Sequence, residues 1–230
     1  MPAAARPRAA TDTSTEQALS LLRRDIIGGR FPPGSRLKLA ELSQRYGLSM
    51  MPVREALRRL EGDRLVEVSA HRGATVRPVT VQFLRDLYDV REALEGLLVE
   101  ACCQRADDAA RVRIQTLATA WDAAAERGDT ARTLEANRRF HAAINDAGGN
   151  AEAIELLSRG WPLVQALRQR IGFSQPRLTD IRAQHHALVQ AILAGDSAAA
   201  RSASNLHCRA ARDDLIGQLE RIGALSIAGG

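Results

Sequence analysis

The sequence is poor in cysteine and contains no long hydrophobic run. Cys102, Cys103 and Cys208 are odd in number and form no CxxC pattern, so we expect free thiols in a reducing cytoplasm. No apolar stretch reaches the ~18 residues of a membrane span, and we see no secretory segment; we therefore expect a soluble, cytoplasmic protein with no membrane partner. Lysine is also scarce, because every basic residue except Lys38 is arginine.

The excess positive charge is confined to the N-terminal third of the chain. The 230 residues carry a formal charge of +5, but residues 1–78 hold 14 Lys+Arg against 8 Asp+Glu, while residues 79–230 hold 18 against 19. A chain of this length suits one large or two modest domains. The asymmetry indicates a polyanion-binding module joined to a nearly neutral one.

The segment 49–61 predicts a helix with two different faces. Ser49 is of a helix-capping type, and Pro52 is tolerated only in a first turn. Arg54 and Arg58 are four residues apart and share one face, whereas the opposite face is apolar through Val53, Ala56, Leu57 and Leu60. Alone, this pattern fits either an exposed arginine-rich surface or a helix that enters a DNA groove.

Two further helices should precede this segment. We expect a disordered arm over residues 1–14, an amphipathic helix from Thr15 to the Gly28-Gly29 pair, and a helix over residues 39–46. Gly47-Leu48-Ser49 then forms a tight corner into the arginine-bearing helix. Helix, short glycine-containing turn and helix is the helix-turn-helix arrangement.

A β-hairpin should follow these helices. Residues 65–68 and 74–77 are two short β-prone runs, with a glycine-containing tip between them. His71 and Arg72 at this tip could reach DNA phosphate or the minor groove, although a solvated loop position explains His71 equally well. Three helices followed by such a wing, together with the charge excess, favour DNA binding over an accidental arginine face.

These segments resemble the winged helix-turn-helix of GntR-type bacterial transcription regulators. The resemblance covers about residues 15–78 and rests on the runs 31–37, 41–42, 47–49, 52–60 and 72–76. It implies that the recognition helix and the wing contact a DNA operator half-site. It assigns candidate DNA roles to Ser49, Arg54, Arg58 and Gly73, and the predicted DNA-binding set also includes Arg36, Met50, Met51, His71 and Arg72.

The chain departs from this family at Met50 and Met51, where relatives commonly carry Arg and Thr. Methionine can contact a thymine methyl group, but it cannot form the bidentate hydrogen bonds that arginine makes with guanine. We therefore expect a shifted operator sequence.

After residue 79 the β signal almost vanishes and apolar residues recur at helical spacing. We predict helices over 81–105, 107–127, 130–147, 151–172 with a kink at Trp161-Pro162, 177–194 and 196–221. Their short connections imply an antiparallel bundle, and no fixed-period repeat supports a helical solenoid. The expected fold class is mainly α, with a winged helix-turn-helix over 15–78 and a bundle of six to seven helices over 79–230.

Three histidines of the predicted bundle should converge. Asn137 and His141 are four residues apart on one helical face. His185 lies ten residues before the turn at 195–196 and His207 eleven after it, so both rings should lie ~15 to ~16 Å from that turn. Singly, each histidine is more often an ordinary packed or exposed residue. Together they form a plausible ligand set for a divalent metal, with open positions for water or ligand.

The runs 137–141, 185–196 and 206–207 look like the FCD-type ligand-binding domain of the FadR subfamily. The resemblance implies a metal held by Asn137, His141, His185 and His207 beside an effector pocket. Zinc is the first choice and nickel, manganese or iron the alternatives. Because Asn137 stands where aspartate is usual, metal binding should be weakened or retuned. His186 is about 100° further round the helix, so we leave it out.

Arg91 interrupts the leucine stripe of the first bundle helix. Two interpretations stay open: an ion pair with Glu95 four residues later, or a planar fork that binds a carboxylate effector. The FadR subfamily favours the second, because residues 90–95 match its Val-Arg-x-x-Leu-Glu run and many members sense small organic acids.

We therefore expect a ligand-responsive, dimeric transcription regulator, usually a repressor in this family, that binds a palindromic double-stranded operator and a small organic acid. The alternative class is a metal-dependent hydrolase that uses the three-histidine site to activate water. Against an enzyme, no recognised motif places a general base nearby, and an enzyme would not need a winged helix. In a third possibility, the metal is purely structural.

Overall fold

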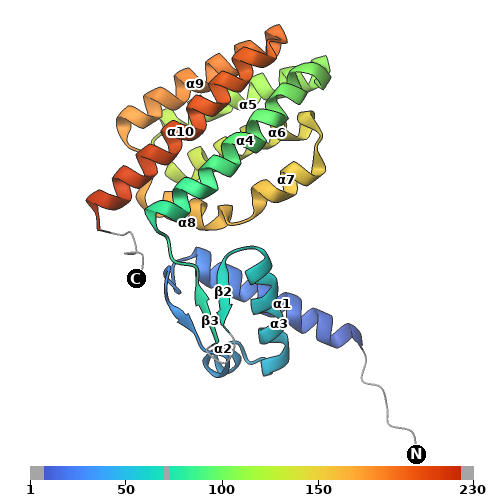
Figure 1. Cartoon of the computed structure of the whole chain (residues 1–230), viewed down its shortest axis with the longest axis vertical. Coiled ribbons are helices and arrows are strands. Elements are labelled where there is room, and N and C mark those ends of the chain that lie inside the picture. The colour runs from blue at the N-terminus through green and yellow to red at the C-terminus, as the bar shows by residue number, and fades with distance from the viewer. Residues whose placement is uncertain (1–7, 70–72, 224–230) are drawn as a thin grey trace, which may run out of the picture. The chain divides into compact units, whose positions relative to one another are not determined.

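The computed structural model describes residues 8–69 and 73–223 (Figure 1). The chain forms two compact units, one built from the segment up to Val79 together with Arg159–Ala166, and the other from Thr80–Ser158 and the segment from Leu167 onward. Most of this structure is helical, and the small sheet lies in the first unit. The expected mainly α fold class is therefore confirmed. Each unit is described separately below.

In its described residues up to Val79, the first unit contains three helices and a three-stranded antiparallel sheet. Its elements are α1 Arg8–Ile27, β1 Arg36–Leu37, α2 Leu39–Tyr46, α3 Met50–Gly62, β2 Val66–Ser69 and β3 Gly73–Val76. The strand order is β1-β3-β2, with Val66 opposite Val76 and Ser69 opposite Gly73. The predicted helices and hairpin are present. The sequence did not predict β1, because a strand of two residues has no alternation to detect.

Helix α1 begins before the position expected from the sequence. Residues 8–14, which we assigned to a disordered arm, are helical in the structure, while residues 1–7 lie outside the described part. Alanine and arginine have high helix propensity, and extending an existing helix costs much less than nucleating one. Further along α1, the buried side chains Ala18, Leu22 and Ile26 belong to the core. Helix α3 packs against α1, so this core supports the predicted recognition helix.

Seven helices follow in the described part after Val79: α4 Val81–Arg105, α5 Asp108–Glu126, α6 Thr130–Gly148, α7 Ala151–Ser158, α8 Trp161–Ile171, α9 Gln175–Ala194 and α10 Ser197–Arg221. The prediction of one kinked helix over 151–172 is wrong, because α7 and α8 are separate. Gly160 has a φ of 73°, a left-handed conformation that ends a helix, and Pro162 can only occupy the first turn of a new one.

In the second unit, α4 packs against α6 and α10, while α9 packs against α5 and α10 (Figure 1). The core between them includes Phe140 from α6 and Leu188 and Ile192 from α9. Helices α6, α9 and α10 carry His141, His185 and His207, respectively. The bundle thus brings together residues that are far apart in the sequence.

Candidate functional site

Helix α3 presents an arginine face to solvent. Arg54 and Arg58 are exposed, while Pro52, Val53, Ala56, Leu57 and Leu60 are buried. Ser49 occupies the N-cap position, but its side chain makes no capping hydrogen bond. Met50 and Met51 are 54% and 66% exposed, which is high for such apolar side chains. The first turn of α3 therefore presents an apolar tip beside two guanidinium groups.

The wing lies at the other end of the predicted DNA-binding segment. Arg36 is exposed on β1, opposite Thr75 of β3. Gly73 begins β3 with a φ of 83°, and a Cβ at this position would lie 3.2 Å from the Leu37 carbonyl oxygen, so a side chain is disfavoured there. His71 and Arg72 lie outside the described residues, and their predicted DNA contacts stay predictions.

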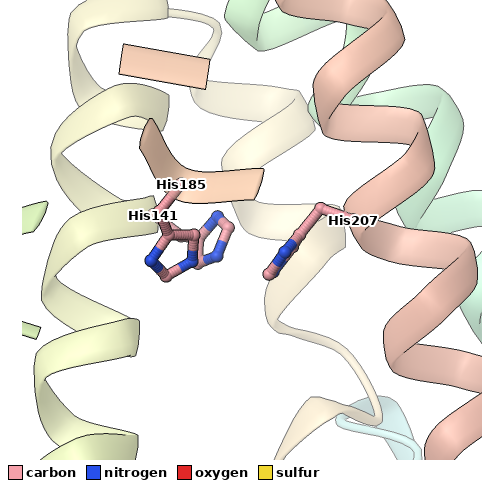
Figure 2. Close-up of side chains that lie close together, drawn as sticks. All are labelled: His141, His185 and His207. Carbon is pink, nitrogen blue, oxygen red and sulfur yellow. The ribbon is translucent and has the colours of Figure 1, made fainter. Parts of the chain in front are cut away.

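The three predicted histidines converge in the bundle. Figure 2 shows the rings of His141, His185 and His207 gathered together. Their ring centroids are 5.4 Å apart for His141 and His185, 4.9 Å for His141 and His207, and 5.0 Å for His185 and His207. One nitrogen from each ring lies within 4.8 Å of the others. This arrangement brings three imidazole donors into range of a single metal ion.

The environment of the rings favours the uncharged imidazole, which is the form that binds metals. Burial lowers the pKa of His141 to about 4 and lowers the pKa values of His185 and His207 well below the ordinary value. Both ring nitrogens of His185 are buried without a hydrogen-bond partner. Buried polar atoms normally have a partner, so His185 is poised to bind a ligand.

His207 is oriented by two residues that we did not predict. The His207 Nδ1–H group donates to Gln184 Oε1 at 3.0 Å, and Arg177 Nη1 donates to the same oxygen at 2.7 Å. This arrangement leaves Nε2 of His207 as the lone-pair nitrogen. Hydrogen bonds of this kind fix the tautomer and orientation of metal-binding histidines. The donor set and its support therefore fit a divalent metal.

Two further side chains, Asn137 and His186, lie on the helices that carry His141 and His185. Asn137 lies one turn before His141 on α6 and is partly buried, but its predicted metal contact stays a prediction. His186 is exposed, and its Nε2 lies 2.8 Å from Asp122 Oδ2. This contact engages His186 outside the three-ring cluster, as its angular position on the helix predicted.

Arg91 forms an ion pair with Glu95, the partner that one of the two interpretations proposed. Glu95 also accepts a hydrogen bond from Cys208 Sγ at 2.9 Å. Burial would raise the pKa of Glu95, but the charge of Arg91, the proximity of His141 and the Cys208 bond together lower it below the ordinary value. Glu95 is therefore a carboxylate that balances the charge of Arg91.

Two other buried cations, Arg168 and Arg177, were missed by the sequence reasoning. Arg168 pairs with Asp214 at 2.6 Å. The sequence did contain a signal for Arg177, because it shares one stripe of α9 with Ile181, Gln184 and Leu188 at helical spacing. The same argument that selected Arg91 could have selected it.

The fold and these sites define the class of the protein: a winged helix-turn-helix with an exposed arginine face, combined with a helical domain, is typical of transcription regulators that bind DNA. Residues 14–76 match the family described as bacterial regulatory proteins, gntR family, and residues 86–210 match the FCD domain. The chain belongs to the gntR family and carries an FCD domain. The predicted family is thus confirmed.

Individual relatives agree with this assignment. The chain is 32% identical over 196 residues to the HTH-type transcriptional repressor GlaR of Escherichia coli, covering 81% of this chain and 88% of that protein. It resembles the structure of a GntR transcriptional regulator from Rhodococcus with 26% identity, a TM-score of 0.66 and coverage of 89% and 98% of the two chains. The structure of E. coli McbR/YncC shares the fold, with 23% identity, a TM-score of 0.69 and coverage of 91% and 98%.

These relatives are named as regulators and not as enzymes, so the chain is a transcription regulator and the hydrolase alternative is set aside. Within residues 8–69 and 73–223, no helix is both long enough and apolar enough to cross a membrane.

Proposed function

We propose that this regulator is a cytoplasmic repressor that binds a palindromic operator as a homodimer and responds to a small carboxylate at a metal site in its helical domain. The observation that carries the proposal is the cluster of His141, His185 and His207, with both His185 nitrogens buried and unpartnered. A domain with only a packing role would leave these polar atoms unsatisfied at a cost in stability.

In this proposal a divalent metal, zinc first and nickel, manganese or iron as alternatives, is held by His141, His185, His207 and Asn137. When bound, the metal supplies a Lewis-acid position for oxygen atoms of an acid. Arg91 is the proposed partner of the acid's carboxylate, because it is close enough to His141 and His207 to lower their pKa values. Its pairing with Glu95 keeps this guanidinium in place when no acid is bound.

For DNA binding, we propose that α3 enters the major groove and that the wing, with Arg36, Gly73, His71 and Arg72, contacts the flanking backbone. Ser49 and the exposed Met50 and Met51 lie at the N-terminal end of α3, the end from which recognition helices contact base edges. Two apolar side chains in this position favour thymine methyl groups over guanine in the contacted bases.

The metal-dependent effector proposal has a direct test. A thermal-shift screen of small carboxylates with the metal-loaded protein should reveal at least one acid that stabilises it, because a ligand that binds only the folded state raises its stability. The stabilisation should disappear when a chelator is added. Stabilisation that persists without metal would contradict the proposed site, and so would a complete absence of stabilising acids.

The proposed dimer has a candidate surface on α4 and α10. Val90 and Leu97 lie seven residues apart on one face of α4 and are exposed, and exposed Leu206 lies on α10. The two helices run antiparallel and are joined by ion pairs between Arg201 and Glu100 and between Arg212 and Asp89. Exposed apolar residues on two packed helices are candidates for an interaction surface.

We expect light scattering to give twice the mass of one chain, and the double variant Val90→Glu with Leu97→Glu to give the mass of a single chain. Two buried, unpaired carboxylates in each partner would oppose association. Val112→Glu on α5 is the matched control, because Val112 is at least as exposed as Val90 and Leu97 but lies on another helix. A dimer that survives the double substitution would exclude this surface.

A further inference from the structure

Arg177 is a buried cation without a carboxylate partner. It lies in the first turn of α9 and is only 3% exposed. Among the described residues, no carboxylate oxygen lies within the 4.0 Å of an ion pair with its guanidinium. Nη1 donates to Gln184 Oε1 at 2.7 Å, Nη2 donates to the His207 carbonyl oxygen at 3.2 Å, and Nε is buried with no partner.

The buried Glu95 and the partly buried Asp214 are already engaged by other groups. Asp214 accepts hydrogen bonds from Arg168 at 2.6 Å, from Ser174 at 2.8 Å and from Gln218 at 2.9 Å. Glu95 is paired with Arg91 and accepts the Cys208 hydrogen bond. Neither group forms an ion pair with Arg177. An arginine remains protonated even when it is buried, so its charge calls for an anion from outside the chain.

The charges around the histidine cluster indicate how many anionic groups such a ligand would carry. The Arg91–Glu95 and Arg168–Asp214 pairs are each neutral, whereas Arg177 forms no ion pair; Asp214 and the exposed Asp180, one turn along α9, act on its charge only from a distance. The proposed metal ligands, three neutral imidazoles and Asn137, would leave a divalent ion unbalanced as well. A single carboxylate would leave most of this positive charge uncompensated.

Arg177 and the proposed metal position lie on different sides of the His207 ring. Nη2 of Arg177 lies 3.5 Å from His207 Nδ1, on the side of the ring that bonds to Gln184. The lone-pair nitrogen Nε2 points away from that side, because the two ring nitrogens of imidazole project in different directions. Arg177 and the lone-pair nitrogen of His207 therefore lie on different sides of the same ring.

We propose that Arg177 forms a second anion-binding position and that the effector is an acid with two anionic groups, one at the histidine cluster and one on Arg177. This inference rests on the proposed metal-dependent effector site. Arg177 offers a planar fork that suits bidentate binding of a carboxylate. It would therefore determine specificity for diacids over monoacids.

The test compares acids of equal length by isothermal titration calorimetry on the metal-loaded full chain. We expect succinate to bind more tightly than butyrate, or adipate more tightly than hexanoate, by about 10- to 100-fold, the contribution of a hydrogen bond to a charged group. Arg177→Gln should reduce this ratio to near one, measured on protein whose metal content has been checked by elemental analysis, because Arg177 also supports His207 through Gln184. Arg177→Lys should retain part of the preference.

Arg170→Gln is the matched control, because Arg170 is exposed at the end of α8. A wild-type protein that binds mono- and dicarboxylates equally would overturn the inference and leave the proposed function intact. An Arg177→Gln variant that loses its metal would assign Arg177 to the orientation of His207 and overturn its role as an anion site. If no carboxylate binds in the presence of metal, both proposals fail.

Discussion

Replacing His185 and His207 together with alanine should leave the protein unable to retain a metal ion. Two of the three imidazole donors would be removed, and Asn137 and His141 alone make a weak ligand set. The metal content that elemental analysis gives after zinc loading and gel filtration should fall from about one ion per chain to background.

In the wild type, removing the metal with a chelator should lower the free energy of unfolding by about 3–4 kcal/mol, relative to protein at metal concentrations 100- to 1,000-fold above Kd.

The adjacent residue His186 provides the matched control for this double variant. His186→Ala removes an imidazole from the same helix, but His186 is engaged with Asp122, so metal content should not change. Gln184→Leu should have an intermediate effect and weaken metal binding about 10- to 100-fold, because the His207 ring would lose its orienting acceptor. Full metal occupancy in the double histidine variant would reject the site.

The convergence of the histidines could be predicted because helical geometry is regular. Counting residues from the turn at 195–196 placed His185 and His207 at the same height, and their ring centroids are 5.0 Å apart. The support around them could not be predicted in the same way. Gln184 and Arg177 act through hydrogen bonds to a residue on another helix, and the choice of partner depends on rotamers and on local packing, which spacing does not determine.

The boundaries of the helices could likewise be predicted only in part from the sequence. Leu39 and Tyr46 bound α2 as predicted, because a glycine follows it directly. The break between α7 and α8 was predicted only as a kink, since the sequence could not show whether Gly160 would adopt its left-handed conformation. For Arg91, the sequence left two partners open, and only the three-dimensional contacts reveal the ion pair with Glu95.

Replacing Arg54 or Arg58 with alanine should weaken operator binding by about 1–3 kcal/mol each if these residues contact bases. Both guanidinium groups are exposed on α3, and within the described part of the chain neither takes part in an ion pair, so both are available to DNA. The measurement is a gel-shift titration with a palindromic fragment that the wild-type protein selects from random DNA. A second titration with unrelated DNA separates base contacts from phosphate contacts, since only base contacts discriminate between sequences.

Arg59→Ala is the control for this experiment, because Arg59 lies on the same helix but its guanidinium is paired with Glu16 of α1. It should change operator affinity much less than either of the other two substitutions. The salt dependence adds a further criterion: replacing an arginine that contacts only phosphate reduces the steepness of log K against log salt by about 1 and weakens binding to all sequences equally. Wild-type affinity in both the Arg54 and Arg58 variants would show that the exposed face of α3 is not the DNA-binding surface. The operator would then have to be contacted mainly by the wing.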